Sequence, residues 1–175
     1  MRFSASLFLI FACGFITPLT ARAQTIQGTW VLDAGASDTM EEIVADALTK
    51  VNAAYRLPII RGVAERRLRE TNAPYPWMRI EMLGDSVEVR SPSWTLTSPR
   101  NGSVEDWRPG NGEGIDVTTR MAKGELVQIF EAQDGSRVND ISLSAGGDLL
   151  TMKVTVASPK LSEPLHYRLV FRRRV

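Results

Sequence analysis

Apolar residues recur at every second position from Trp77 to the end of the chain, and this spacing constrains the fold more than any other feature. A period of two is typical of a β-strand that buries one face, because successive side chains point to opposite sides. Glycine-containing pairs, among them Gly84-Asp85, Asp134-Gly135 and Gly146-Gly147, separate the alternating runs and are typical of hairpin turns. The sequence therefore predicts a series of short antiparallel strands over residues 77–175.

Two helices are predicted ahead of these strands, between about residues 38 and 70. In the first, Asp38 is positioned as the N-cap with Glu41 three residues later, and apolar residues from Met40 to Val51 share one face. The second is expected over 58–70, since proline fits the first turn and an apolar stripe follows it. Its other face carries several arginines, which a solvent-exposed surface explains better than contact with lipid head groups.

A first strand precedes the helices and contains the pattern Gly28-x-Trp30, with Ile26, Trp30 and Leu32 on one face. This pattern resembles the opening of the calycin superfamily, the lipocalins and fatty-acid-binding proteins, in which the Trp lies on the floor of a barrel. A helix pair after the first strand is similar to the fatty-acid-binding branch in particular. The resemblance implies a mainly β fold: a closed antiparallel up-and-down β-barrel of about ten strands with a two-helix insertion after the first strand. Closure also removes the exposed strand edges.

The N-terminus has the composition of a secretory signal peptide. Arg2 precedes a largely apolar run, and Ala21-Arg22-Ala23 fits the small-x-small cleavage rule. The predicted domains are therefore a signal at 1–23 and a lipocalin-like barrel at 24–175, exported to the periplasm or secreted. A retained anchor is disfavoured because the apolar run is shorter than a membrane span. Lipidation at Cys13 is a further alternative.

Removal of the signal leaves 152 residues without cysteine, because Cys13 is the only one. That length suits a single domain with a core of its own. The remaining 19 basic and 20 acidic residues nearly balance, so composition gives no indication of nucleic-acid binding. We expect a single-domain monomer with no transmembrane span in the mature chain.

The strand alternation predicts which side chains face the barrel interior. Methionines are useful in such a site because they adapt to different shapes. The candidate ligand-binding residues are Met78, Ile80, Met82, Trp94, Ile115, Val117, Met121, Met152, Val154, Tyr167, Leu169 and Phe171. The same side chains are equally able to fill a small barrel, which leaves open whether the interior binds anything.

Trp30 is expected to be a packing residue of the barrel floor. In lipocalins a basic side chain from the last strand covers this Trp, which implies that Arg172, Arg173 or Arg174 does so here. Of these we assign Arg172 to the floor. The alternative is that all three form a solvated terminus.

Fatty-acid-binding proteins hold a carboxylate with an Arg and a Tyr two apart on the last strand. Matching Phe171 to that Tyr puts Leu169 at the Arg position, and Arg168 falls on the opposite face. The resemblance therefore gives no residue-by-residue support for a carboxylate anchor, and a neutral apolar ligand is favoured.

His166 is the only histidine, and no Gly-x-Ser-x-Gly elbow or metal-ligand cluster accompanies it. Its position in the alternation directs it outward, which disfavours haem binding. We therefore predict no catalysis, no metal and no cofactor. The leading hypothesis is an exported barrel that binds a small apolar molecule, and the alternative is a filled structural or interaction barrel of the cell envelope.

The signal assignment predicts that the mature protein begins at Gln24. N-terminal sequencing of protein recovered from the periplasm or the culture medium tests it. Recovery only from the cytoplasm with Met1 intact would contradict export.

Overall fold

The computed structural model describes residues 25–52, 58–110, 112 and 114–174. The predicted signal therefore lies outside the described residues. The helices are α1 (Met40–Thr49) and α2 (Pro58–Asn72). The strands are β1 (Gly28–Leu32), β2 (Trp77–Leu83), β3 (Ser86–Arg90), β4 (Thr95–Pro99), β5 (Asn101–Trp107), β6 (Ile115–Ala122), β7 (Glu125–Ala132), β8 (Gly135–Leu143), β9 (Leu149–Ala157) and β10 (Leu165–Arg173).

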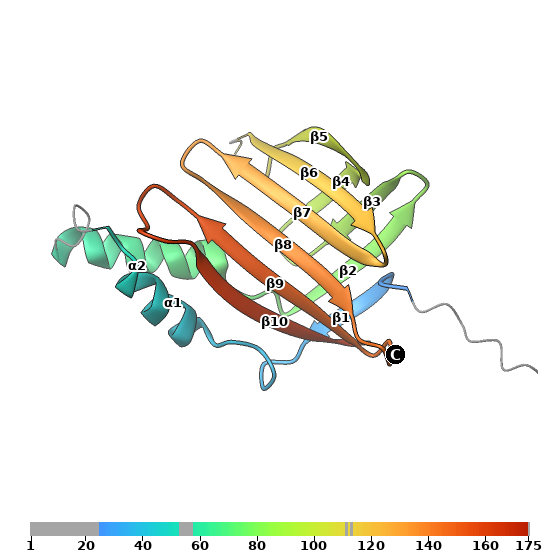
Figure 1. Ribbon diagram of the computed structural model, residues 1–175, viewed down its shortest axis with the longest axis horizontal. Coiled ribbons are helices and arrows are strands. Elements are labelled where there is room, and N and C mark those ends of the chain that lie inside the picture. Colours follow the sequence, from blue (N-terminus) through green and yellow to red (C-terminus); the bar gives the residue numbers. More distant parts are fainter. Residues whose placement is uncertain (1–24, 53–57, 111, 113, 175) are drawn as a thin grey trace, which may run out of the picture.

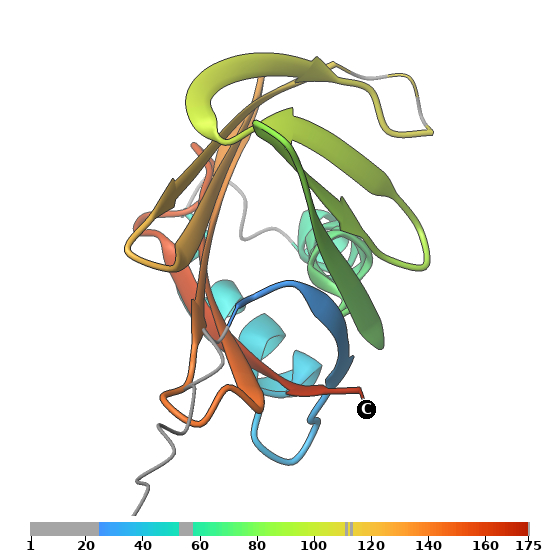
Figure 2. The same ribbon diagram turned by 90° about the vertical axis from the view of Figure 1, so that its right-hand side faces the viewer.

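The ten strands form one antiparallel sheet in the order β4-β3-β2-β1-β10-β9-β8-β7-β6-β5 (Figure 1). The sheet curls into a barrel because β1 pairs with both β2 and the last strand, β10. Viewed from the end opposite the helices, it wraps around a common interior (Figure 2). Among the described residues no ladder joins β4 to β5, so the predicted barrel is confirmed as nearly closed.

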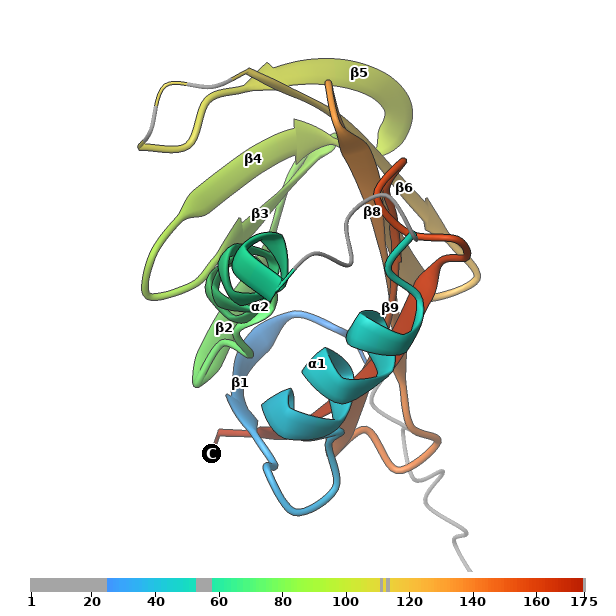
Figure 3. The same cartoon turned by 90° about the vertical axis from the view of Figure 1, so that its left-hand side faces the viewer.

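The two helices lie over one end of the barrel (Figure 3). In α1, Ile43, Val44 and Ala47 are buried, and the helix contacts both β10 and α2. This insertion between β1 and β2 confirms the prediction from the sequence. No helix in the described ranges has the length and apolarity needed to cross a membrane.

The start of α1 differs from the prediction by one residue. Thr39 is the N-cap, and it forms a capping box with Glu42. Hydrogen bonds from Thr39 lower the pKa of the Glu42 carboxyl. Asp38 instead accepts a hydrogen bond from the backbone N–H of Arg168 at 2.6 Å. Asp38 is not the N-cap because its side chain accepts this hydrogen bond from β10.

Trp30 is fully buried and lies opposite Arg173, the last residue of β10. Figure 1 shows this end of the chain at the barrel end away from the helices. Trp30 Nε1 donates to the Ile26 carbonyl at 2.9 Å. The Arg173 guanidinium carbon lies 4.3 Å from the centroid of the Trp30 ring, a cation–π contact. The floor assignment of Arg172 is therefore wrong: its side chain points outward and pairs with Asp33 at 2.7 Å. Arg173 has the inward position because it shares the parity of Phe171.

The Arg173 side chain also donates three hydrogen bonds to backbone carbonyls. The acceptors are Gly147 at 3.0 Å, Gln27 at 2.7 Å and Thr25 at 2.6 Å. Gly28 leaves room for this arrangement, since a Cβ at that position would lie 2.7 Å from Arg173 Nη1. Its φ of 137° also favours glycine. The Gly28-x-Trp30 pattern is thus explained by a side chain that packs between the first and last strands.

We expect Arg173→Ala to lower the free energy of unfolding by about 2 kcal/mol, because it removes the cation–π contact and the bonds to the carbonyls. Arg174→Ala is the matched control, since Arg174 is exposed, and it should change stability by less than about 0.5 kcal/mol. Urea unfolding followed by Trp fluorescence measures both. Equal effects of the two substitutions would contradict this role of Arg173.

Candidate ligand-binding site

The base of the barrel, the end that contains Trp30, is filled with side chains. Seven of the predicted interior residues are at most 1% exposed: Met78, Ile80, Val117, Met152, Val154, Leu169 and Phe171. All seven lie on the inner face as expected, and six of them belong to one hydrophobic cluster with Trp30. Val117 is outside that cluster, and it lies with Val154 further from the base, opposite Phe130 and Asn139, respectively. The other five are Tyr167, which is 5% exposed, and the half-buried Met82, Trp94, Ile115 and Met121. Contact of these residues with a ligand stays a prediction.

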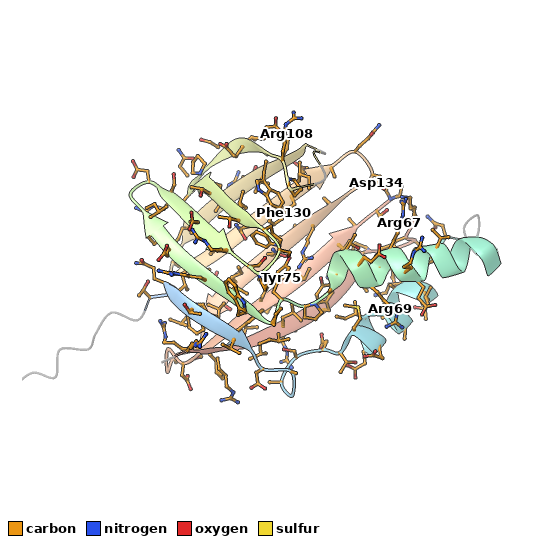
Figure 4. All side chains as sticks on the ribbon, turned by 180° about the vertical axis from the view of Figure 1, so that it is seen from behind. Arg67, Arg69, Tyr75, Arg108, Phe130 and Asp134 are labelled. Atoms are coloured by element: carbon orange, nitrogen blue, oxygen red, sulfur yellow. The ribbon has the colours of Figure 1, made fainter. Side chains whose placement is uncertain are left out.

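Four half-buried aromatic rings follow one another near the end of the barrel that the helices cover. The ring centroids of Tyr75 and Trp94 are 5.3 Å apart, those of Trp94 and Trp107 5.6 Å, and those of Trp107 and Phe130 6.1 Å. Each pair meets edge to face, an arrangement that aromatic quadrupoles favour. We call these four residues the aromatic row. Tyr75 and Phe130 are labelled in Figure 4.

Arg137 reaches the same region from β8. Its guanidinium carbon lies 5.9 Å from the ring centroids of both Tyr75 and Tyr167. Its Nε donates to Asn139 Oδ1 at 2.8 Å, and its Nη1 donates to the Thr71 carbonyl at 3.4 Å. Aromatic faces and neutral acceptors therefore surround this cation.

Tyr167 joins β10 to the C-terminal end of α2. Its hydroxyl donates to Asn72 Oδ1 at 3.2 Å, and Asn72 Nδ2 in turn donates to the Leu68 carbonyl at 3.1 Å. Burial raises the pKa of Tyr167 to about 12, so the phenol keeps its proton at neutral pH. This end of α2 is thus bonded to both Tyr167 and Arg137, which fixes it over the aromatic row.

The charge of Arg67 on α2 acts on the barrel through the carboxyl of Asp134, without a direct ion pair between the two. Asp134, in the turn between β7 and β8, pairs with Lys160 at 2.7 Å. The hydrogen bond and charge of Lys160 lower the pKa of the Asp134 carboxyl, and the charge of Arg67 on α2 adds to the effect. Figure 4 shows Arg67 near Asp134.

A layer of polar side chains crosses the inner face between the base and the aromatic row. The ladders place Thr119 of β6 opposite Gln128 of β7, and Gln128 opposite Asn139 of β8. Ser98 of β4 bonds to Thr119 of β6, with 2.6 Å between the hydroxyl oxygens. All four are at most 1% exposed. We call Ser98, Thr119, Gln128 and Asn139 the polar layer.

The sequence analysis missed Arg137 and the whole polar layer. Polar residues at alternate positions normally mark the solvent side of a strand, so their types directed attention outward. The strand alternation did indicate the inner face for two of them, because Arg137 and Asn139 occupy the same face of β8 as Ile141 and Leu143. In β7 the sequence has apolar residues on both faces and does not distinguish them. The register with β6 and β8 places Leu126, Gln128 and Phe130 on the inner face.

The last strand has the predicted faces. Tyr167, Leu169 and Phe171 point inward, while Arg168 is exposed and donates to the Ala36 carbonyl at 3.3 Å. His166 is exposed as well, and its Nδ1 lies 3.0 Å from Thr155 Oγ1. Within the described ranges no group of three or more Cys, His, Asp and Glu side chains is placed to hold a metal ion.

Two hollows occur at the rims of the sheet. One of about 470 Å³ is lined by Asp106, Arg108, Gly114, Asp116, Glu131, Ala132 and Gln133. The other, about 350 Å³, adjoins the turn between β4 and β5 and is lined by Asp85, Arg100, Asn101 and Met121. Of the predicted interior residues, Met121 alone lines either hollow.

No family model and no curated protein sequence matches the chain. Solved structures do. The fatty-acid-binding protein of Manduca sexta is 13% identical, with a TM-score of 0.53 over 83% of this chain and 98% of that one. The Schistosoma mansoni fatty-acid-binding protein in complex with arachidonic acid is 16% identical, with a TM-score of 0.52 over 85% and 96%.

The chain has the fold of a fatty-acid-binding protein. The fluorescent protein UnaG is similar to the same degree, at 15% identity and a TM-score of 0.54 over 85% of this chain and 97% of that one. These structures bear out the calycin resemblance at the level of architecture. At such identities the likeness concerns the barrel and not its contents.

Proposed function

We propose that this chain is an exported, non-enzymatic barrel that binds a small, mainly apolar molecule in the half of its interior nearest the helices. The observation that carries the proposal is the aromatic row. Four rings stand together near the inner face, yet each keeps part of its surface accessible, unlike the buried side chains of the base. Covering that apolar surface with a ligand is favourable at about 25 cal/mol per Å².

The filled base limits the size of the ligand. Trp30, Leu150 and Phe171 are not exposed at all, so a long molecule has no room to lie along the whole barrel axis unless the core rearranges. We therefore propose a compact ligand or one that inserts only partly. The edge-to-face rings of the aromatic row suit both aromatic and aliphatic groups of a ligand.

A filled structural or interaction barrel is the second candidate. It is favoured by the same tight base and by the position of the two hollows at the sheet rims. Both candidates share the proposed export, which rests on the composition of residues 1–23. Neither includes catalysis, since the only histidine, His166, is exposed on the outer face and away from the aromatic row.

Titration with the neutral dye N-phenyl-1-naphthylamine tests the proposal. We expect a saturable rise in dye fluorescence that Trp107→Leu weakens about tenfold, because Trp107 contacts two other rings of the row. Trp77→Leu is the matched control: Trp77 lies on the outer face opposite Val31, so its loss should leave affinity unchanged. Absence of saturable binding would favour the filled barrel instead.

A further inference from the structure

Gln128 is the one member of the polar layer whose side chain is left without partners. It is 1% exposed in the middle of β7, and neither its Nε2 nor its Oε1 has a hydrogen-bond partner in the described part of the chain. Burying an amide without hydrogen bonds is unfavourable, and most buried side-chain amides are paired. Such a side chain on the inner face is a strong indication that another molecule supplies the missing bonds.

The neighbours of Gln128 are engaged in other bonds. Thr119 Oγ1 is bonded to Ser98 Oγ at 2.6 Å, and Asn139 Oδ1 accepts from Arg137 Nε at 2.8 Å. Turning either side chain toward Gln128 would break a buried hydrogen bond to form a new one. The layer therefore has little to gain from rearranging around its own unpaired amide.

The position of Gln128 connects the polar layer to the aromatic row. Phe130, the last ring of the row, lies two residues further along the same inner face of β7. On the side of the base, Leu126 is fully buried. A molecule that enters past the aromatic row therefore meets Gln128 at its leading end, with apolar contacts behind it.

We propose that Gln128 is the polar anchor of the ligand and that it selects a neutral group able both to donate and to accept hydrogen bonds, such as a carboxamide. The proposal rests on the ligand-binding function proposed above. A carboxamide forms two reciprocal bonds, one from Gln128 Nε2 to its oxygen and one from its N–H to Gln128 Oε1. A carboxylate or an ester only accepts, so it leaves Oε1 without a donor.

Binding at Gln128 requires neighbouring side chains to move, because the amide is almost completely buried in the unliganded barrel. The two bonds gained by an unpaired amide favour that opening. The same reasoning gives a prediction for the free protein: replacing Gln128 with an apolar residue of similar length removes an unsatisfied polar group and should not destabilise the fold.

Dye displacement by dodecanamide, methyl dodecanoate and dodecanoate tests the anchor. For the wild type we expect dodecanamide to compete about tenfold better than either acceptor-only compound. In Gln128→Met that preference should fall to about twofold or less, with dye affinity retained and an unchanged or higher melting temperature. Gln133→Met is the matched control, since Gln133 is an exposed glutamine in the next turn, and it should keep the wild-type preference.

The possible outcomes separate the anchor from the function. Dye binding without preference for the amide, or a preference that survives in Gln128→Met, overturns the anchor and leaves the binding function intact. Tighter competition by dodecanoate overturns it as well and points to the nearby cation of Arg137. A wild-type protein that binds no dye overturns the proposed function and the anchor together. A marked loss of stability in Gln128→Met shows that the amide is paired in solution, which also counts against it.

Discussion

The packing of Arg173 on Trp30 is the contact on which the barrel depends. It joins the last strand to the first, and the three carbonyls that Arg173 binds come from the segment before β1 and from the turn between β8 and β9. Gly28 permits the close approach, and Trp30 supplies the apolar floor. Because β1 and β10 are joined in this way, neither strand has an exposed edge. Because this base is sealed and densely packed, any site inside the barrel must lie toward the other end.

That other end is organised in layers. The polar layer separates the apolar base from the aromatic row, and the end of α2 lies over the row. Tyr167 of β10 donates a hydrogen bond to Asn72 at this helix end, and Arg137 of β8 donates one to the Thr71 carbonyl. The raised pKa of Tyr167 keeps its phenol a hydrogen-bond donor at every ordinary pH. The end of α2 is therefore fixed to the barrel by these two polar contacts, and access for a ligand depends on whether they open.

Much of the architecture was predictable from sequence because its signals are local. Alternation identifies strands, and glycine pairs mark turns, so the ten strands and the inserted helices followed from residue order. The Gly28-x-Trp30 pattern located the floor. The choice among three consecutive arginines was harder, since only strand parity distinguishes Arg173 from Arg172, and both have carboxylate or aromatic partners.

The candidate site was less predictable because its polar residues contradict the ordinary rule for strands. Arg137, Gln128 and Asn139 occupy inner positions, where composition alone would place them in solvent. The bonds that make this tolerable, such as Arg137 to Asn139, join residues whose pairing depends on the register of the sheet. Local sequence reports side-chain type, whereas the site results from which strands lie side by side.

The most direct test of ligand binding in the half of the barrel nearest the helices uses the indole N–H signals of the four tryptophans in two-dimensional NMR. Dodecanol is a suitable probe because it has no ring to perturb neighbouring signals. The account predicts that Trp94 and Trp107 shift on titration, while the buried Trp30 and the outward Trp77 do not. Unchanged signals throughout, or a largest shift at Trp30, would contradict it.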